Sequence, residues 1–315
     1  MPIAPILMTP AYRCGEMTPW GGDRMAKVYG RKLPDAQTGE SLEVSAIPGL
    51  ESRDAQGRTL PELIALYGEA LTGTAVKGPF PLLLKLLDAR DTLSVQVHPD
   101  DAYAAAVEHK LGKTEAWHIL AADEGAQLVY GVKKGVTKEA LLAASRAGAA
   151  VEDLLRYVPV KAGETYYIPA GMVHAIGRGI MLYEIQQSSD VTYRFYDWER
   201  TDQNGNKRAL HIQKAVDVTD VNAQLSAAPE GFVAPGHQRL LNEKYFMLDQ
   251  YRDFSGVVAR DPRRFAILTA LGETTLRWEG GETALLPGQT ALLPADGYDL
   301  HLETREALLS CPTLA

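Results

Sequence analysis

The sequence is poor in cysteine, has no excess of basic residues and contains no long hydrophobic run. Its two cysteines, Cys14 and Cys311, stand near opposite ends of the 315 residues, so we expect neither a disulfide framework nor a zinc site built from thiolates. With 40 acidic against 32 basic residues and a net charge of −8, the chain lacks the clustered positive charge of a nucleic-acid surface. No stretch approaches the roughly 18 apolar residues of a membrane helix, and the start, MPIAPILMTPAYRC, is unlike a signal peptide. We therefore expect a cytoplasmic protein that binds neither nucleic acid nor membrane.

Short strands dominate the pattern that is present. Apolar and polar residues alternate over runs of four to eight residues, and Gly and Pro separate the runs. The segments concerned are SLEVSAI, AWHIL, AQLVYGV, ETYYIP, IMLYEIQQ and VTYRFYDW, and, in the last eighty residues, FAILTAL, TTLRW, TALLPG, TALLPA and YDLHLE. Many short strands of this kind predict a β-sandwich or barrel.

Two helices are predicted in the first part of the chain. One spans about 60–71, where Pro61 suits the first turn and an apolar face repeats at helical spacing. The second is AYAAAVEHKL, with Asp100 or Asp101 as its N-cap and Gly112 as its end.

Three further segments are less clearly defined. Residues 137–157 carry two helical stretches interrupted by Gly148, and residues 200–235 are expected to be less structured. The run FPLLLKLLDA, residues 80–89, is apolar at almost every position. Periodicity does not decide whether this run forms a buried strand or a buried turn of helix.

A weak internal repeat relates two glycine-containing segments. AGETYYIPA (162–170) aligns with PGQTALLPA (287–295), and the same offset places Asp299 opposite His174. We interpret this as two related β units, of which only the first keeps the histidine. The alternative is a chance recurrence of a turn, a strand and a proline.

Four polar residues form a candidate metal-binding set. Gln96 and His98 share one face of a strand by its period of two, Glu115 opens the next strand, and His174 follows a Pro-Ala-Gly turn. Nitrogen and oxygen donors of this kind suit Zn²⁺ and would also accept Fe²⁺, Co²⁺ or Mn²⁺. The alternative is that each histidine is a hydrogen-bonded structural residue, because the two are distant in sequence and their proximity depends on the fold.

These residues also carry a resemblance to a known family. The segment GETYYIPAGMVH (163–174) resembles the second cupin motif, and Gln96-x-His98 resembles a variant of the cupin His-x-His motif, with Glu115 supplying the acid. Longer segments resemble the type I mannose-6-phosphate isomerase family, in the same order along the chain: GESLEVSA, LLLKLLDARDTLSVQVHPDD, GKTEAW, IPAGMVHAIG and EIQQSSDVTYRFYDW.

The resemblance implies a fold and a metal site. The fold is mainly β with helical insertions, a cupin-type antiparallel barrel or jelly roll followed by a second, degenerate C-terminal β-barrel. One Zn²⁺ per chain is implied, and the positions matching the family's ligands are Gln96, His98, Glu115 and His174. In short bacterial forms, which this chain resembles, three protein ligands plus water are the alternative to a set that includes Gln96.

Two domains follow from the resemblance and the repeat. Residues 1–225 would form the catalytic cupin domain, with a small helical insertion at about 100–111 and 137–157. Residues 226–315 would form a cupin-like β domain without a metal.

The implied reaction is the interconversion of mannose 6-phosphate and fructose 6-phosphate through a cis-enediol. The partner would be a small sugar phosphate, and the protein a monomer or a homodimer. Two alternatives stay open: an isomerase of a non-phosphorylated sugar, and a non-catalytic sugar-binding cupin.

The reaction needs a group that stabilises negative charge and a group that moves a proton. The family's active-site arginine matches Arg194, whose guanidinium suits an enediolate; the alternative is a salt bridge to Asp190 or Asp197. For the base, Glu184, Asp190 and Lys113 are equivalent candidates from sequence.

The phosphate requires local positive charge in an acidic protein. Lys85 interrupts the apolar run LLLKLL, where an unpaired ammonium group would be costly to bury. It either points into the site or pairs with a core carboxylate. Lys113 and Ser94 are further candidates for contact with the substrate.

Overall fold

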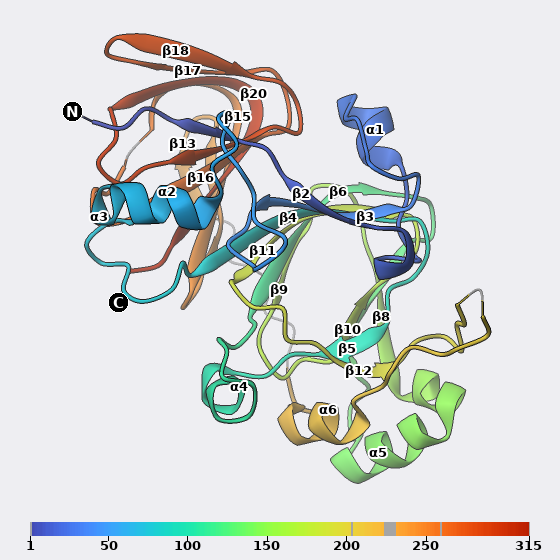
Figure 1. Ribbon diagram of the computed structural model, residues 1–315. Helices are drawn as coiled ribbons and strands as arrows, with labels where there is room; N and C mark the ends of the chain where they lie inside the picture. Colours follow the sequence, from blue (N-terminus) through green and yellow to red (C-terminus); the bar gives the residue numbers. More distant parts are fainter. Residues whose placement is uncertain (1, 203, 224–230, 259, 315) are drawn as a thin grey trace.

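Figure 1 shows a computed structural model of the chain, which describes residues 2–202, 204–223, 231–258 and 260–314. Over these residues the chain is mainly antiparallel β and forms three sheets. Two sheets face each other as a barrel, and the third, orange and red in Figure 1, packs against the outer side of the larger barrel sheet. The predicted fold class, a β protein of cupin type with helical insertions, is confirmed.

The barrel consists of a six-stranded and a five-stranded sheet. The order in the larger sheet is β2 (Ala11–Cys14), β3 (Thr38–Val44), β4 (Leu82–Ala89), β11 (Ile180–Gln187), β6 (Glu115–Ala122) and β9 (Thr165–Ile168). The order in the smaller sheet is β12 (Tyr193–Tyr196), β5 (Val95–Val97), β10 (His174–Ile176), β7 (Gln127–Val132) and β8 (Leu155–Pro159). The facing sides share one apolar core, to which the sheets contribute Trp117 and Tyr130, respectively.

The apolar run at residues 80–89 forms a strand, β4. Leu84 and Leu86 point to the third sheet and join the apolar core there. Leu83 and Lys85 point the other way and line a cleft between the barrel sheets. Because both faces are covered, almost every position is apolar, which explains why periodicity could not distinguish strand from helix.

The third sheet contains nine strands. Its main path is β1 (Ile6–Met8), β19 (Thr290–Leu293), β16 (Ala266–Ala270), β20 (Leu300–Pro312), β15 (Phe246–Val258), β14 (His237–Asn242) and β13 (Gly231–Ala234), and β17 (Thr274–Trp278) and β18 (Gly281–Leu285) pair beside β20. The first strand of the chain therefore lies in the sheet of the C-terminal unit. The predicted boundary at residue 225 falls among residues 224–230, outside the described residues, and the division into two domains stays a prediction.

The two repeat segments have the same local structure. Residues 162–170 contain β9, and residues 287–295 contain β19 at the matching position. Gly163 and Gly288 precede these strands with φ of 90° and 85°, a conformation that glycine adopts at little cost. Each segment therefore consists of a turn glycine followed by a strand. That the two β units as a whole are related stays a prediction.

Helices cover the outside of the sheets. They are α1 (Arg24–Tyr29), α2 (Leu60–Tyr67), α3 (Glu69–Thr72), α4 (Asp101–Glu108), α5 (Lys138–Arg146) and α6 (Ile212–Val218), with 3-10 turns η1 (Gly15–Met17) and η2 (Gly148–Leu154). In Figure 1, α5 and α6 lie beside the smaller barrel sheet, and they share an apolar core with it. None of the described helices is long and apolar enough to cross a membrane.

Two predicted helices end earlier than expected. The helix predicted over 60–71 is divided by Gly68, whose φ of 54° stops α2. Asp100 caps α4 by accepting a hydrogen bond from the Tyr103 backbone. That helix ends at His109, which has a φ of 55°, and not at Gly112.

Two further expectations were wrong in part. The second helical stretch within 137–157 is the 3-10 turn η2, and it leads directly into strand β8 at Leu155. Helix α6 lies inside the segment expected to be less structured. It buries only Ala215 and Val216, so its apolar face is too short to stand out in the sequence.

A buried ion pair ties the N-terminal segment to the third sheet. Arg31 donates to both carboxylate oxygens of Glu43, at 2.6 and 2.8 Å, and Thr290 of β19 donates to the same carboxylate at 3.1 Å. The Glu43 side chain is fully buried, and that of Arg31 is 11% exposed. Removing one partner of such a pair leaves the other charge buried and unpaired.

We therefore expect Glu43→Gln to lower the free energy of unfolding by about 3–5 kcal/mol, measured by chemical denaturation. The double variant Arg31→Met/Glu43→Gln should recover most of this loss because neither charge remains. The matched control Arg305→Gln removes one partner of an exposed pair with Asp253 and should cost less than about 1 kcal/mol. Unchanged stability of Glu43→Gln would contradict the role given to this pair.

Candidate active site

Two histidines and a glutamate converge between the barrel sheets. His98 follows β5, Glu115 begins β6 and His174 begins β10. The Nε2 atom of His174 lies 3.3 Å from Glu115 Oε1, and Nε2 of His98 lies 3.5 Å from Oε2. All three side chains are buried, and their donor atoms lie within 4.8 Å of one another. Three of the four predicted metal ligands are therefore brought together by the fold.

The arrangement fits a divalent cation. Donors around a tetrahedral zinc with bonds of about 2.0–2.1 Å are separated by about 3.4 Å, close to the spacings found here. Both oxygens of Glu115 are buried and accept no well-aligned hydrogen bond. His174 Nδ1 lies 2.8 Å from the Met172 carbonyl, which places the proton on Nδ1 and leaves the Nε2 lone pair for a metal.

Gln96 lies beside this cluster. It is opposite His174 in the β5–β10 register, and its Nε2 atom is 3.3 Å from His174 Nε2. Rotating the Gln96 side-chain amide by a half-turn would exchange its nitrogen and oxygen and place Oε1 beside His174 Nε2 instead. Gln96 is thus within reach of an ion that the cluster would hold, and its role as a ligand stays a prediction.

Lys113 supplies the positive charge nearest to the cluster. Its Nζ atom lies 2.6 Å from Glu115 Oε2 and 2.8 Å from His98 Nε2, and its side chain is only 6% exposed. Burial raises the pKa of Glu115, and Lys113 opposes that shift. Burial and the Lys113 ammonium together lower the pKa of His98 well below its usual value, so this imidazole is neutral, as a metal ligand requires.

Lys85 lines the cleft and also pairs with carboxylates. Both alternatives considered from the sequence, pointing into the site and pairing with a core carboxylate, therefore apply to this residue. Its Nζ atom lies 3.1 Å from Glu184 and 3.6 Å from Glu40. Trp117 donates to the second oxygen of Glu184 at 2.9 Å. Burial acts to raise the pKa of Glu184, but the ammonium groups of Lys85 and Lys113 outweigh it and lower that pKa.

Arg194 forms neither of the salt bridges considered from sequence. Among the described residues, Asp190 pairs with Lys110 at 2.6 Å and Asp197 with Arg208 at 3.5 Å. Arg194 pairs across β12 and β5 with Gln96, and its Nε atom is buried without a hydrogen bond. Its guanidinium is therefore available to a ligand.

A cleft adjoins the cluster and collects the remaining predicted residues. Gln96 and Lys113 line it and contact the metal-ligand set. The other predicted residues along its walls are Lys85, Ser94, Glu184, Asp190 and Arg194. The fold thus brings every sequence-predicted site residue to one place.

Comparison with known proteins identifies the family. Residues 13–124 match the family model of the phosphomannose isomerase type I catalytic domain. A mannose-6-phosphate isomerase of Streptococcus mutans is 40% identical over 284 residues, which cover 87% of this chain and 88% of the relative. The chain belongs to the type I phosphomannose isomerase family. The resemblance noted from the sequence motifs is therefore confirmed.

Relatives from Bacillus subtilis support the same placement of this phosphomannose isomerase family member. The mannose-6-phosphate isomerase ManA of that organism is 34% identical over 299 residues, covering 89% of this chain and 92% of the relative. A crystal structure of the mannose 6-phosphate isomerase from B. subtilis superposes with a TM-score of 0.90 at 33% identity. It covers 98% of this chain, and this chain covers 99% of it, so the third sheet is shared as well as the barrel.

Sequence reasoning missed three charged side chains of the cleft in this family member. Arg13 on β2 and Glu40 on β3 are cross-strand partners joined by a 3.2 Å hydrogen bond, and Arg208 lies after β12. Glu40 had a recognisable signal, because an acid within the otherwise buried strand GESLEV requires a partner. Arg208 stands in a polar segment and Arg13 in a short, half-buried strand between Tyr12 and Cys14, so neither position gave such a signal.

Proposed function

We propose that this family member is a zinc-dependent mannose-6-phosphate isomerase that acts through a cis-enediol. The observation that carries the proposal is the buried cluster of His98, Glu115 and His174 beside a cleft rich in basic groups. An aldose–ketose isomerase needs both features, since negative charge develops on the sugar oxygens and the phosphate is itself an anion.

The chemistry divides between a metal and the chain's own residues. A Zn²⁺ held by the three residues, with Gln96 or water as a fourth ligand, would act when bound as a Lewis acid toward the substrate oxygens. The unpaired guanidinium of Arg194 donates to the oxygen on which charge develops. Because that group stays charged and is already in place, it stabilises the enediolate more than the substrate.

Three groups are candidates to move the proton. Glu184 is buried and held ionised by Lys85, Asp190 is 34% exposed and paired with Lys110, and Lys113 contacts the metal-ligand set. The base is the group whose removal stops exchange of the C2 hydrogen while sugar binding persists. Glu184→Gln, Asp190→Asn and Lys113→Met provide that comparison.

Lys85 and Ser94 are proposed to contact the substrate. Both are buried and line the cleft, and Lys85 also pairs with Glu40 and Glu184 at its wall. A small sugar phosphate as the partner, a monomer or homodimer as the assembly, and the cytoplasm as the location complete the proposal.

The proposal is tested with two sugars compared under the same conditions. We expect conversion of mannose 6-phosphate to fructose 6-phosphate in a coupled assay, solvent exchange of the C2 hydrogen, and a much lower kcat/KM for mannose. Equal kcat/KM for the two sugars would indicate an isomerase of free sugars. Sugar binding without any hydrogen exchange would indicate a non-catalytic cupin.

A further inference from the structure

The cleft is positively charged although the whole protein is acidic. Five basic side chains line it, against three acidic ones, while the chain carries a net charge of −8. An excess of positive charge at one concave place in an acidic protein favours an anionic ligand there. The pairing and burial of each of the five basic groups decide which of them can bind such a ligand.

The two lysines are already paired. Lys85 lies between Glu184 and Glu40, and Lys113 lies against Glu115. Their side chains are each 6% exposed, so both sit at the deep end of the cleft. Their charges are compensated by carboxylates of the chain.

Two arginines are less buried and less fully paired than the lysines, although each has one carboxylate partner. Within the described part of the chain the Arg13 side chain makes one hydrogen bond, at 3.2 Å to Glu40, whereas a guanidinium has five donors. Arg208 has Asp197 as its ion-pair partner at 3.5 Å, and its NH1 atom is buried without a hydrogen bond. These side chains are 26% and 28% exposed, which places them nearer the mouth of the cleft. Both arginines lower the pKa of Arg194, after the larger effect of burial.

The arrangement matches the two ends of the substrate. In a hexose 6-phosphate the reacting carbons and the phosphate are at opposite ends of the molecule. With C1 and C2 at the deep end, beside the metal-ligand set, the phosphate would lie toward the mouth. Guanidinium groups bind phosphate through paired N–H donors, which adds geometric selectivity to charge.

We propose that Arg13 and Arg208 bind the substrate phosphate and set the preference for a phosphorylated sugar. This inference rests on the proposed isomerase function and adds the residues that select its substrate. Lys85 then holds the carboxylates at the deep end, and its contact with the sugar is closer to the reacting carbons than to the phosphate.

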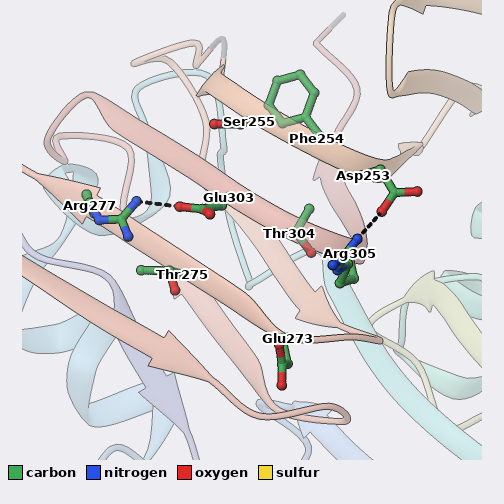
Figure 2. Close-up of a pocket in the computed structure, with 9 residues that line it drawn as sticks. All are labelled: Asp253, Phe254, Ser255, Glu273, Thr275, Arg277, Glu303, Thr304 and Arg305. Carbon is green, nitrogen blue, oxygen red and sulfur yellow. Dashed lines mark hydrogen bonds and ion pairs between the residues drawn. The ribbon is translucent and has the colours of Figure 1, made fainter.

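A larger hollow on the third sheet lacks these properties. Its volume is about 470 Å³, against about 80 Å³ for the cleft. Figure 2 shows its arginines aimed at acidic neighbours, Arg277 at Glu303 (2.7 Å) and Arg305 at Asp253 (3.1 Å). Three acidic side chains line this hollow against two basic ones, so it has no excess of positive charge. Arg305 is therefore a suitable control for removing one exposed guanidinium.

The test compares Arg13→Gln, Arg208→Gln and the control Arg305→Gln with the wild type. The two cleft variants should each lower kcat/KM for mannose 6-phosphate by about tenfold to a hundredfold, the loss expected for a charged hydrogen bond. Their kcat/KM for mannose should change by less than about threefold. Mannose has no phosphate, so these variants lose no charged hydrogen bond to it. Inorganic phosphate, titrated by calorimetry, should bind them more weakly than the wild type, while the control matches the wild type in all three measurements.

Several results would overturn the inference. An equal loss on both sugars would show that the arginines act on the fold or on the reacting end. Unchanged phosphate binding in both cleft variants would also refute it, and this measurement does not depend on turnover. If the wild type binds phosphate through these arginines but isomerises neither sugar, the proposed function fails and the phosphate site stands. If Arg208→Gln does not fold, Arg208→Lys serves instead, with a smaller loss expected because the charge is kept without the fork.

Discussion

Removing divalent cations should reduce isomerase activity by about a thousandfold or more. Lewis-acid stabilisation of a developing oxyanion amounts to several kcal/mol, and about 4 kcal/mol corresponds to a thousandfold in rate. His98, Glu115 and His174 present buried donor atoms within 4.8 Å of one another. Dialysis against a chelator, followed by the coupled assay and by metal analysis, measures the effect, and added Zn²⁺ should restore both activity and metal content.

The fold should survive this treatment. Lys113 lies 2.6 Å from Glu115 and remains as its counter-charge, so the apoprotein should keep the circular dichroism spectrum of the loaded protein. Glu115→Ala should lose the metal as well as activity. His118→Asn is the matched control, because His118 lies on the same strand but bonds to Thr165 instead of joining the cluster. Full activity in folded, metal-free protein would refute the metal-dependent mechanism.

Arg194→Ala should lower kcat by about a hundredfold to a thousandfold, the usual effect of losing one preorganised donor to an oxyanion. The guanidinium has no ion-pair partner among the described residues, and its Nε atom is buried without a hydrogen bond. Its removal therefore breaks no ion pair among the described residues. The measurement is steady-state kinetics with mannose 6-phosphate, together with sugar binding and zinc content.

The pattern of kinetic constants distinguishes the roles of the arginines. In Arg194→Ala the loss should fall on kcat, with KM nearly unchanged and one zinc per chain retained. Arg194→Lys should recover only part of the activity, because an ammonium group lacks the planar pair of donors. Wild-type kcat in Arg194→Ala would exclude a role in stabilising the enediolate, and loss of zinc would indicate a structural role near the cluster.

Much of the fold was predictable because it depends on local pattern. Alternation located most strands, and the turn glycines before β9 and β19 marked the repeat. The helix ends were less predictable, since His109 adopts a left-handed conformation that only a few per cent of non-glycine residues adopt, even though histidine is enriched among them. Helix α6 escaped notice because a short helix with two buried residues leaves little periodicity.

The site was predictable in its residues but not in its pairings. The motifs pointed to the metal-ligand set, whereas the neighbours of each group depend on strand register. Glu184 meets Lys85 across β11 and β4, and Glu40 meets Arg13 across β3 and β2. Register is set by long-range packing of whole sheets. For this reason the sequence left the partner of Lys85 open and gave no indication of Arg13.

Strand β4 presents leucines to the third sheet on one side and Lys85 to the cleft on the other. A chain shortened to the barrel alone would expose this leucine row to water, together with Tyr183 and Ile185 of the neighbouring strand. Such an apolar patch promotes self-association. The C-terminal unit thus covers the outer face of the larger barrel sheet, whose inner face lines the cleft. Replacing this unit with that of a relative would succeed only where the replacement offers an apolar surface of matching shape.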